Sequence, residues 1–307
     1  MFGSILWNTF FADVAGPAAA SGGQESLFAD DLNVSHQFPR STSNEVVRQV
    51  LTETQTEVHK WGRANRVIFD ASKEHFNIVH TRDGEGEDFK LLGCMTDCKL
   101  TMKGAIDELL SKGRPKIHAM VRTRAHYNTE EMMHQYKTHI WGFVEYPNGC
   151  ISHAINSQLE RLDSMQRSFL HEIDVTEDAA FMHHNFAPLS LRRDIAMLGL
   201  IYKRVLGQAH PAYEDLLPMA PASWYQQTMF RPAHCRQIDS GLRMGILNHD
   251  LWNRSIFGMV GVFNELPHNV VECKTISEFQ HELTVIAKRK CQQGVPDWRH
   301  CSSSRRW

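Results

Sequence analysis

Two adjacent aspartates, Asp30 and Asp31, are the residues of this sequence whose type and spacing most directly indicate a chemical role. Apolar residues flank them on both sides, which predicts a β-hairpin over residues 27–34 with the acids at or beside its turn. Two carboxylates held this close repel each other unless a cation neutralises them. Hard cations such as Mg²⁺ prefer oxygen ligands, and two of them about 4 Å apart assist polynucleotide synthesis by activating the attacking hydroxyl. The alternative is an acidic turn without a ligand.

Positive charge is concentrated in two segments, although the whole chain carries a formal net charge of only −2. The first segment holds seven basic residues against two acids, namely Lys99, Lys103, Lys112, Arg114, Lys116, Arg122 and Arg124. The second runs from Lys288 to the end of the chain and holds six basic residues. Such segments can contact phosphates. The alternative is a solvated face followed by a loose tail.

The seven cysteines are an odd number and are scattered, which favours free thiols in a reducing, intracellular compartment over a disulfide scaffold. Nuclear and cytoplasmic locations both stay open. Cys291, His300 and Cys301 form a weak candidate zinc site. The apolar N-terminal stretch has no Lys or Arg before it and contains Asp13, so it does not predict a signal peptide. No apolar run reaches the roughly 20 residues of a membrane span, and no membrane partner is expected.

The elements that must position these residues change character near residue 100. Before it, the sequence predicts loops at 16–17 and 21–23, a helix from a Thr42–Glu45 capping box to Gly62 or Asn65, and β-rich runs at 67–69, 76–79 and 89–93. After it, apolar periodicity predicts helices over 103–124 and from 129 to about 147, with further stripes over 151–169 and 191–205. The proline-rich residues 211–232 are expected to be irregular and the last residues frayed.

Several short motifs occur in an order that is typical of one protein family. They are Gly3-Ser4 before Leu6–Val14, Phe28-Ala29-Asp30-Asp31, Trp61 with Asn65, Phe69 and Lys73, Leu91-Leu92-Gly93 before Asp97, Leu159 with Leu162, Gln166 and Arg167, Pro188-Leu189 with Arg192-Arg193, and Arg254-Ser255-x-Phe257 with Phe263-Asn264-x-Leu266-Pro267. Together they resemble the reverse transcriptases of non-LTR (LINE-like) retrotransposons, over nearly the whole chain. Phe263 departs from the family pattern, which usually has Trp there.

This resemblance implies an α+β fold: a truncated right-hand polymerase palm followed by a mainly α-helical thumb and C-terminal region. The implied domains are a partial palm over 1–98, a helical thumb-like region over 99–210, an irregular linker over 211–235, and a C-terminal region with a basic tail over 236–307. The fingers and the first palm strand, which carries another essential aspartate in the family, have no counterpart in this sequence.

The resemblance also implies a role for each matching residue. Asp30 and Asp31 would be ligands of Mg²⁺ or Mn²⁺ in a complete palm, and Lys73 would lie near the phosphates of a deoxynucleoside triphosphate, where a fixed cation stabilises developing negative charge. Leu92 and Gly93 would position the end of the DNA primer. The basic residues from Lys99 to Arg124 would follow the phosphates of the duplex between primer and RNA template.

We therefore expect an RNA-directed DNA polymerase by resemblance that does not extend a primer as this chain. A non-catalytic nucleic-acid-binding remnant and an expressed pseudogene product are the two alternatives. The basic segment favours the nucleic-acid-binding remnant, but the sequence alone does not decide between this remnant and a pseudogene product.

Overall fold

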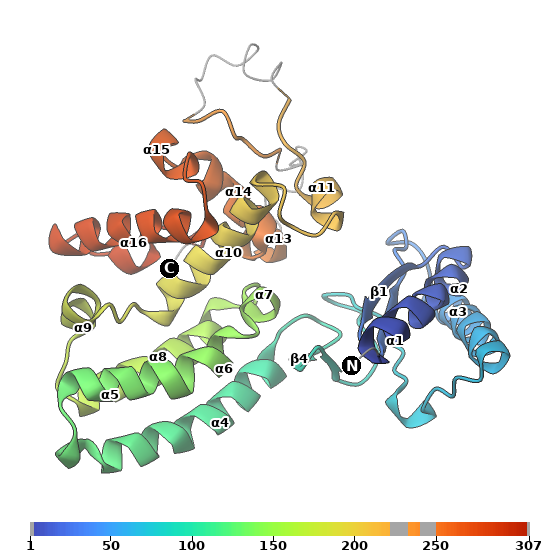
Figure 1. The fold of residues 1–307 in the computed structure, drawn as a ribbon, viewed down its shortest axis with the longest axis horizontal. Coiled ribbons are helices and arrows are strands. Elements are labelled where there is room, and N and C mark those ends of the chain that lie inside the picture. The colour runs from blue at the N-terminus through green and yellow to red at the C-terminus, as the bar shows by residue number, and fades with distance from the viewer. Residues whose placement is uncertain (1–2, 222–232, 240–249, 306–307) are drawn as a thin grey trace. The chain divides into compact units, whose positions relative to one another are not determined.

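The computed structural model describes residues 3–221, 233–239 and 250–305, and these residues are mainly helical with two short β-hairpins. This composition agrees with the α+β class expected from the sequence. Contacts within the chain divide it into two compact units, Met1–Phe89 and Lys90–Trp307. The division falls ahead of the boundary predicted after residue 98. The predicted regions 99–210 and 236–307 both fall in the larger unit, and Figure 1 traces both units by colour along the chain.

The smaller unit combines three helices with one hairpin. Its elements are α1 (Gly3–Phe11), η1 (Ala12–Val14), α2 (Ala15–Ala20), β1 (Gln24–Phe28), β2 (Asp31–Ser35), α3 (Asn44–Asn65) and the turn η2 (Ala71–Lys73). Its core consists of Phe11, Val14 and Val58, with Leu27, Leu32, Trp61 and Phe69 packed against them. Leu27 and Leu32 face each other across the hairpin. Packing of this one face therefore sets the register that leaves Asp30 and Asp31 at the turn of the hairpin.

Several local predictions for this unit were wrong. Gly16 and Pro17 were expected in a loop, yet they belong to the first turn of α2, where a missing proline N–H breaks no helical hydrogen bond. The helix α3 begins one residue later than predicted, with Ser43 and not Thr42 at its N-cap. The runs 67–69 and 76–79 form no strand, and only Ile78 makes an isolated bridge, to Glu85.

The larger unit begins within a second hairpin, β3 (Phe89–Leu91) and β4 (Cys94–Thr96), as the β-rich run at 89–93 predicted. Both residues of the connecting turn have positive φ angles, 46° at Leu92 and 82° at Gly93. This pair is the signature of a type I′ turn, whose twist suits a two-residue hairpin and which favours glycine.

A first helical core follows this hairpin and confirms the predicted helices at 103–124 and 129–147. Its elements are α4 (Lys103–Arg122), η3 (Arg124–His126), α5 (Thr129–Tyr136), the π-helical turn η4 (Lys137–Trp141), α6 (Gly142–Glu145), α7 (Asn148–Ile151) and α8 (Asn156–Glu172). The helix α4 packs along α8, and the buried side chains of both line one continuous core. Asn128 and Glu131 form a capping box that starts α5.

A second core lies around α10 (Leu189–Val205), which contacts both α8 and α16. The remaining elements are α9 (Glu177–His184), α11 (Ala212–Leu216), α13 (Asp250–Arg254), α14 (Ile256–Asn264), α15 (His268–Val271), α16 (Ile276–Gln292) and η5 (Trp298–His300). The predicted irregular linker contains α11, and its residues 222–232 lie outside the described part. Within the described residues, no helix is both long and apolar enough to cross a bilayer.

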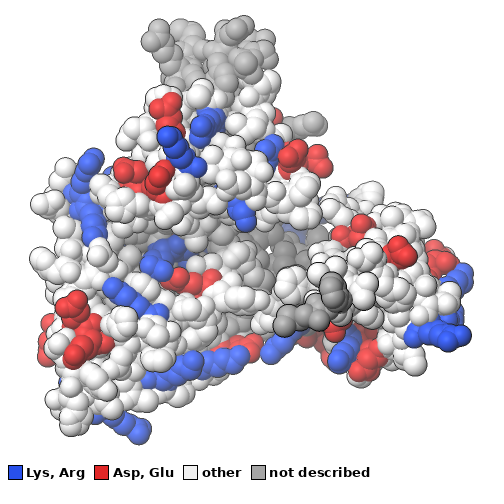
Figure 2. Space-filling view, in the orientation of Figure 1, with Lys and Arg blue, Asp and Glu red and all other residues white. Residues whose placement is uncertain are grey.

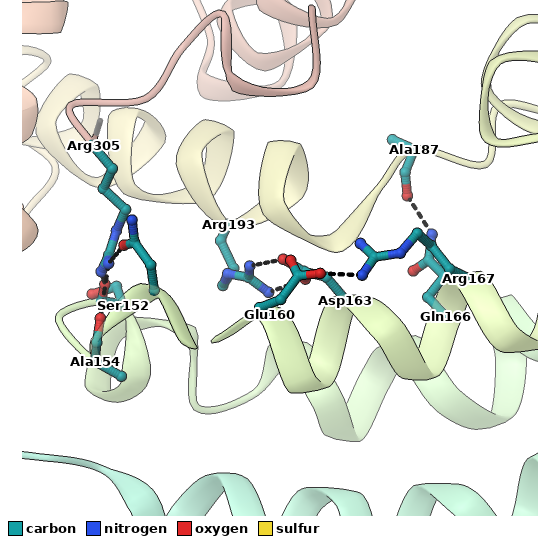
Figure 3. Close-up of polar contacts among 10 residues, drawn as sticks. Ser152, Ala154, Glu160, Asp163, Gln166, Arg167, Ala187, Arg193 and Arg305 are labelled. Carbon is teal, nitrogen blue, oxygen red and sulfur yellow. Dashed lines mark hydrogen bonds and ion pairs between the residues drawn. The ribbon is translucent and has the colours of Figure 1, made fainter. Parts of the chain in front are cut away.

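A buried ion pair joins the two cores (Figure 3). Arg193 on α10 donates two hydrogen bonds, of 2.8 and 2.7 Å, to the carboxylate of Asp163 on α8, and both side chains are less than a tenth exposed. Beside it, the side-chain amide of Gln166 donates to the Ala187 carbonyl oxygen at 3.0 Å. These contacts of Asp163, Arg193 and Gln166 therefore hold the helix α8 to α10 and to the segment just before it.

The described part of the tail, up to Arg305, packs against the helices, contrary to the predicted fraying. Trp298 is buried and stacks on Phe181 with a centroid separation of 4.9 Å. Arg305 donates hydrogen bonds to carbonyl oxygens of the α7–α8 connection, including that of Ala154 at 2.8 Å (Figure 3). An aromatic side chain and a guanidinium group thus bind the tail to the helices that it crosses.

Candidate functional site

Asp30 and Asp31 lie at the turn of the β1–β2 hairpin, as predicted, and both are exposed. Phe28 pairs with Asp31, so the two turn residues are Ala29 and Asp30. Ala29 has a φ angle of 56°, a left-handed conformation that favours glycine. The indole N–H of Trp7 on α1 donates to the Ala29 carbonyl oxygen at 3.3 Å. One hydrogen bond from a neighbouring helix therefore supports a turn that carries two exposed carboxylates.

Lys73 lies at the end of the turn η2, in the same unit, and is exposed. The turn is held by Asp70, whose side chain accepts hydrogen bonds from the backbone N–H and the hydroxyl of Ser72. These hydrogen bonds hold the pKa of Asp70 below its ordinary value. No ion pair joins Lys73 to Asp30 or Asp31 in the described residues. Direct contacts among these three side chains therefore do not hold the predicted nucleotide site together.

The donor set at this turn fits a divalent metal only in part. Carboxylate oxygens are the ligands that Mg²⁺ and Mn²⁺ prefer, and Asp30 and Asp31 supply them from adjacent positions. Within the described residues, however, no group of three or more His, Cys, Asp or Glu side chains could hold a metal ion. A two-metal reaction needs a larger set of carboxylates. The residues present do not make such a cage, and no catalytic step is assigned to them.

The β3–β4 turn, predicted to position a primer end, has an exposed aromatic residue beside it. Leu92 and Gly93 are both exposed. Because Gly93 has a positive φ angle, any side chain placed there would strain the backbone. The hydroxyl of Tyr146, after the end of α6, donates to the Leu92 carbonyl oxygen at 2.9 Å. Tyr146 is 71% exposed. The hydrogen bond therefore orients an aromatic ring that remains open to solvent. Sequence reasoning did not single out Tyr146, because no local pattern connects it with a turn so distant in the chain.

Asp97, which follows this hairpin, serves the start of α4. Its carboxylate accepts hydrogen bonds from the backbone N–H groups of Lys99, Thr101 and Met102, at 3.0, 3.0 and 2.7 Å. Partial burial alone would raise the pKa of Asp97, but these hydrogen bonds outweigh burial and the pKa lies below its ordinary value. An ionised Asp97 therefore fixes the connection between the candidate primer-positioning turn and the basic helix.

All seven basic side chains of residues 99–124 are exposed, but they are not equivalent. Three of them are engaged: Lys112 pairs with Glu108 at 2.6 Å, Arg124 pairs with Glu172 at 2.8 Å, and the Lys116 ammonium lies 4.5 Å from the centre of the Phe143 ring. The other four have no protein partner within the described part of the chain; they are Lys99, Lys103, Arg114 and Arg122. Figure 2 shows Lys and Arg side chains following α4 on the face in view.

Helical geometry separates these cations further. A residue turns by about 100° around the helix axis relative to its predecessor. Lys103 and Arg114 are eleven residues apart, so they lie on nearly the same side of α4, about 16 Å from each other. Lys112 lies on the opposite flank of the helix from Lys103. Lys103 and Arg114 thus lie on the opposite side of α4 from Lys112 and Lys116, and Arg122 lies between these two sides.

The candidate zinc residues occupy different settings. Cys291 is buried in α16 within the second core, whereas His300 and Cys301 lie in and directly after η5. Burial raises the pKa of the Cys291 and Cys301 thiols, which opposes formation of the thiolate that binds zinc. They form no group of metal ligands in the part of the chain that the structure describes.

Comparisons of the chain with family models, curated proteins and solved structures found no match in any of the three. The likeness to reverse transcriptases therefore rests on the sequence motifs alone. Asp30 and Asp31 come together at one turn, in the smaller unit. Leu92, Gly93 and the basic segment come together at the start of the larger unit.

Proposed function

We propose that this protein is related to non-LTR retrotransposon reverse transcriptases and that its larger unit binds the backbone of a primer–template duplex. One arrangement carries the proposal. Lys99, Lys103, Arg114 and Arg122 are exposed, have no side-chain partner among the described residues, and lie in the segment that follows the exposed β3–β4 turn. A cation without an internal partner can bind a phosphate, and release the counterion of that phosphate, without first breaking an ion pair in the protein.

The turn and the helix would make two kinds of contact. Gly93 lets the backbone of the turn approach a nucleic-acid strand closely, since it has no side chain. Lys103 and Arg114, on one side of α4, would contact phosphates, which positions a duplex without reading its sequence. Tyr146 presents an exposed ring on which a base or sugar can stack. The preferred ligand is therefore an RNA–DNA hybrid, bound with little sequence preference.

We also propose that the chain binds this duplex without extending the primer. Asp30 and Asp31 alone supply too few oxygen ligands for two metals, and a Lys73 that is not tied to them would hold a nucleotide's phosphates loosely. Primer extension on a homopolymer RNA template, with deoxynucleoside triphosphates and Mg²⁺ or Mn²⁺, tests this. Extension that Asp30→Ala abolishes would show that a catalytic site is complete in this chain.

Binding is tested by the salt dependence of affinity for a fluorescent RNA–DNA hybrid. Each phosphate contact steepens the plot of log affinity against log salt by about 0.9 for duplex DNA. We expect replacement of Lys103, Arg114 and Arg122 with Ala to flatten this slope by about two to three units.

The matched control replaces Lys112, Lys116 and Arg124 with Ala, which removes the same charge from side chains that have protein partners. It should change the slope much less. Equal effects of the two triple variants would mean that net charge alone drives binding. Absence of binding at low salt would contradict the proposal and favour a chain with no maintained nucleic-acid role.

A further inference from the structure

One arginine of the tail lies among oxygen atoms from two separate parts of the larger unit. Arg305 donates hydrogen bonds to the carbonyl oxygens of Ser152 and Ala154, the latter at 2.8 Å, and to the side-chain oxygen of Asn156 at 2.7 Å (Figure 3). A fourth and longer hydrogen bond, of 3.4 Å, reaches the carbonyl oxygen of Arg254. These four acceptors form what we call the arginine cradle.

The arginine cradle matches both terminal nitrogens of a guanidinium group. Nη1 of Arg305 donates to Ala154 and Asn156, and Nη2 donates to Ser152 and Arg254. Each of these nitrogens carries two hydrogens, so all four hydrogens have an acceptor. A primary ammonium group has one nitrogen with three hydrogens and does not match acceptors that are placed around a planar fork. The geometry therefore selects a guanidinium group over an amine.

Helix ends supply part of the arginine cradle. Ser152 is the residue at which α7 ends, and Arg254 is the last residue of α13. The last carbonyl groups of a helix have no partner within that helix. Asn156 is the first residue of α8, and its side chain completes the set. A guanidinium group therefore meets acceptors at element ends, and binding it breaks no hydrogen bond inside a helix.

A partly open cavity adjoins the arginine cradle, and Ser152, Asp194, Arg254 and Arg305 are among the residues that line it. Asp194 is buried, and one of its carboxyl oxygens has no hydrogen-bond partner in the described part of the chain. Its negative charge, when it is ionised, favours a cation in the cradle, whereas Arg193 and Arg254 oppose one. Burial lowers the pKa of Arg305 to about 10, which still leaves this group charged at neutral pH. The cradle is thus a site for a cation and is not sealed from solvent.

We propose that the arginine cradle is a binding site for an alkylguanidinium group, which Arg305 fills within the chain and which the arginine of a separate peptide fills when Arg305 is withdrawn. The tail is then an internal ligand that keeps the site occupied. Because a short tether gives an effective concentration in the millimolar range, a separate ligand at lower concentration competes poorly with Arg305. The inference does not depend on nucleic-acid binding, because it uses only the cradle and the tail.

The test measures thermal unfolding of the full chain with Arg305→Ala, in the presence of ethylguanidinium. We expect the unfolding temperature to rise by about 2–4 °C when the titration reaches about five times the Kd. Ethylammonium at the same concentrations should have no such effect, and the natural chain should respond little to either compound. No rise with ethylguanidinium, or equal rises with both compounds, would overturn the proposal. Should Arg305→Ala fail to fold, Arg305→Lys takes its place, because its ammonium group leaves part of the cradle unfilled.

Two further variants locate the bound ligand. Asn156→Asp, added to Arg305→Ala, turns a neutral acceptor into a charged one and should lower the Kd of ethylguanidinium about tenfold. Arg124→Ala is the matched control, because it removes an arginine that is about half exposed and contacts only Glu172 among the described residues. It should show no response to ethylguanidinium. An unchanged Kd in the first variant, or an equal response in the second, would place the ligand elsewhere and overturn the proposal.

Two peptides with blocked ends distinguish the sources of the arginine. One is Ser-Ser-Ser-Arg, the sequence of residues 302–305, and the other is Gly-Gly-Gly-Arg. Both should raise the unfolding temperature of Arg305→Ala. Tighter binding of the serine peptide would identify the tail of a second copy as the preferred source, and equal binding would identify arginine-bearing peptides in general. Failure of both peptides, with ethylguanidinium bound, would contradict the proposal that a separate peptide fills the cradle.

Discussion

The hydroxyl group of Tyr146 donates a hydrogen bond to the carbonyl oxygen of Leu92, 2.9 Å away and 54 positions earlier in the chain. The bond uses the only polar atom of the side chain and leaves most of the ring exposed. It therefore orients an aromatic surface beside the β3–β4 turn without burying it. Protein surfaces that bind single strands or strand ends use aromatic rings in this way.

Tyr146 offers the sharpest test of where the proposed duplex lies. Tyr146→Ala should weaken binding of the RNA–DNA hybrid by about 1–3 kcal/mol, the typical value of one base stacked on an aromatic ring. Tyr146→Phe keeps the ring and loses only its anchor, so it should fall between Ala and the natural residue. Fluorescence anisotropy at two salt concentrations measures both, and the loss should not depend on salt. Unchanged binding by Tyr146→Ala, with weakened binding by the variant at Lys103, Arg114 and Arg122, would exclude Tyr146 and keep the proposed function.

The buried pair of Asp163 and Arg193 should matter far more for stability than the exposed pair of Glu172 and Arg124. Asp163→Ala leaves a buried guanidinium group without its carboxylate, which typically costs about 3–5 kcal/mol. Glu172→Ala removes a pair whose side chains are about half exposed, and such pairs contribute about 1 kcal/mol or less. Urea unfolding of both variants compares the two. Similar losses would mean that the α8–α10 contact is not sealed from water.

Asp194, next to that ion pair, should make stability depend on pH. Its carboxyl group is buried with one oxygen atom lacking a hydrogen-bond partner in the described structure. Burial raises the pKa of Asp194 to about 7, although the nearby Arg193 opposes the rise. Between the ordinary value of 3.8 and about 7, the folded chain binds more protons than the unfolded chain at this group, so its contribution to stability is lost as pH rises through this window.

Asp194→Asn cannot ionise and should escape this loss. The free energy of unfolding of the variant, relative to that of the natural chain, should increase from about pH 4 to about pH 7 and then level off. His153 and His300, whose pKa values are lowered chiefly by burial, destabilise both proteins alike as pH falls and cancel in the difference. Urea titrations across this range provide the measurement. A constant difference would mean that Asp194 stays ionised throughout.

Two buried tyrosines should respond in opposite ways to loss of their hydroxyl groups. The Tyr136 hydroxyl is buried in the first core and has no hydrogen-bond partner among the described residues. Tyr136→Phe should leave stability unchanged or raise it by about 1 kcal/mol, because an unpaired polar group is removed. The Tyr202 hydroxyl bonds to the carbonyl oxygens of Val271 and Cys273, and Tyr202→Phe should cost about 1–2 kcal/mol. Thermal unfolding in which both variants lose stability equally would contradict the assignment for Tyr136.

The left-handed conformation of Ala29 predicts a stabilising substitution at the acidic turn. Ala29→Gly removes a strain of about 1–2 kcal/mol but adds freedom to the unfolded chain, so the smaller unit should gain about 1 kcal/mol or less. Ala64→Gly, at an exposed position of α3, is the control and should lose about 0.5–1 kcal/mol. Scanning calorimetry resolves the transition of this unit. A loss of stability in Ala29→Gly would mean that the turn relaxes to another conformation in solution.

Local patterns in the sequence predicted the local features of this fold. Apolar residues on both sides of Asp30 and Asp31 identified the first hairpin, and 3.6-residue periodicity identified the long helices such as α4 and α10. The run 67–69 misled because β propensity reflects packing against a partner strand, and Ile68 is instead 96% exposed. Contacts between distant residues, such as Tyr146 with Leu92 and Arg193 with Asp163, follow from how helices pack and leave no trace in sequence spacing.

The hydrogen bonds of Arg305 imply an order of events as the chain is synthesised and folds. The ribosome makes the chain from its N-terminus, and segments begin to fold as they emerge. The first core can form once Leu189 has been made. Unless another molecule supplies a guanidinium group, the carbonyl groups of Ser152 and Ala154 can bind only water until residue 305 has been made. Nascent chains that stall before that point would therefore carry a formed core with an exposed α7–α8 connection, where proteases could cut.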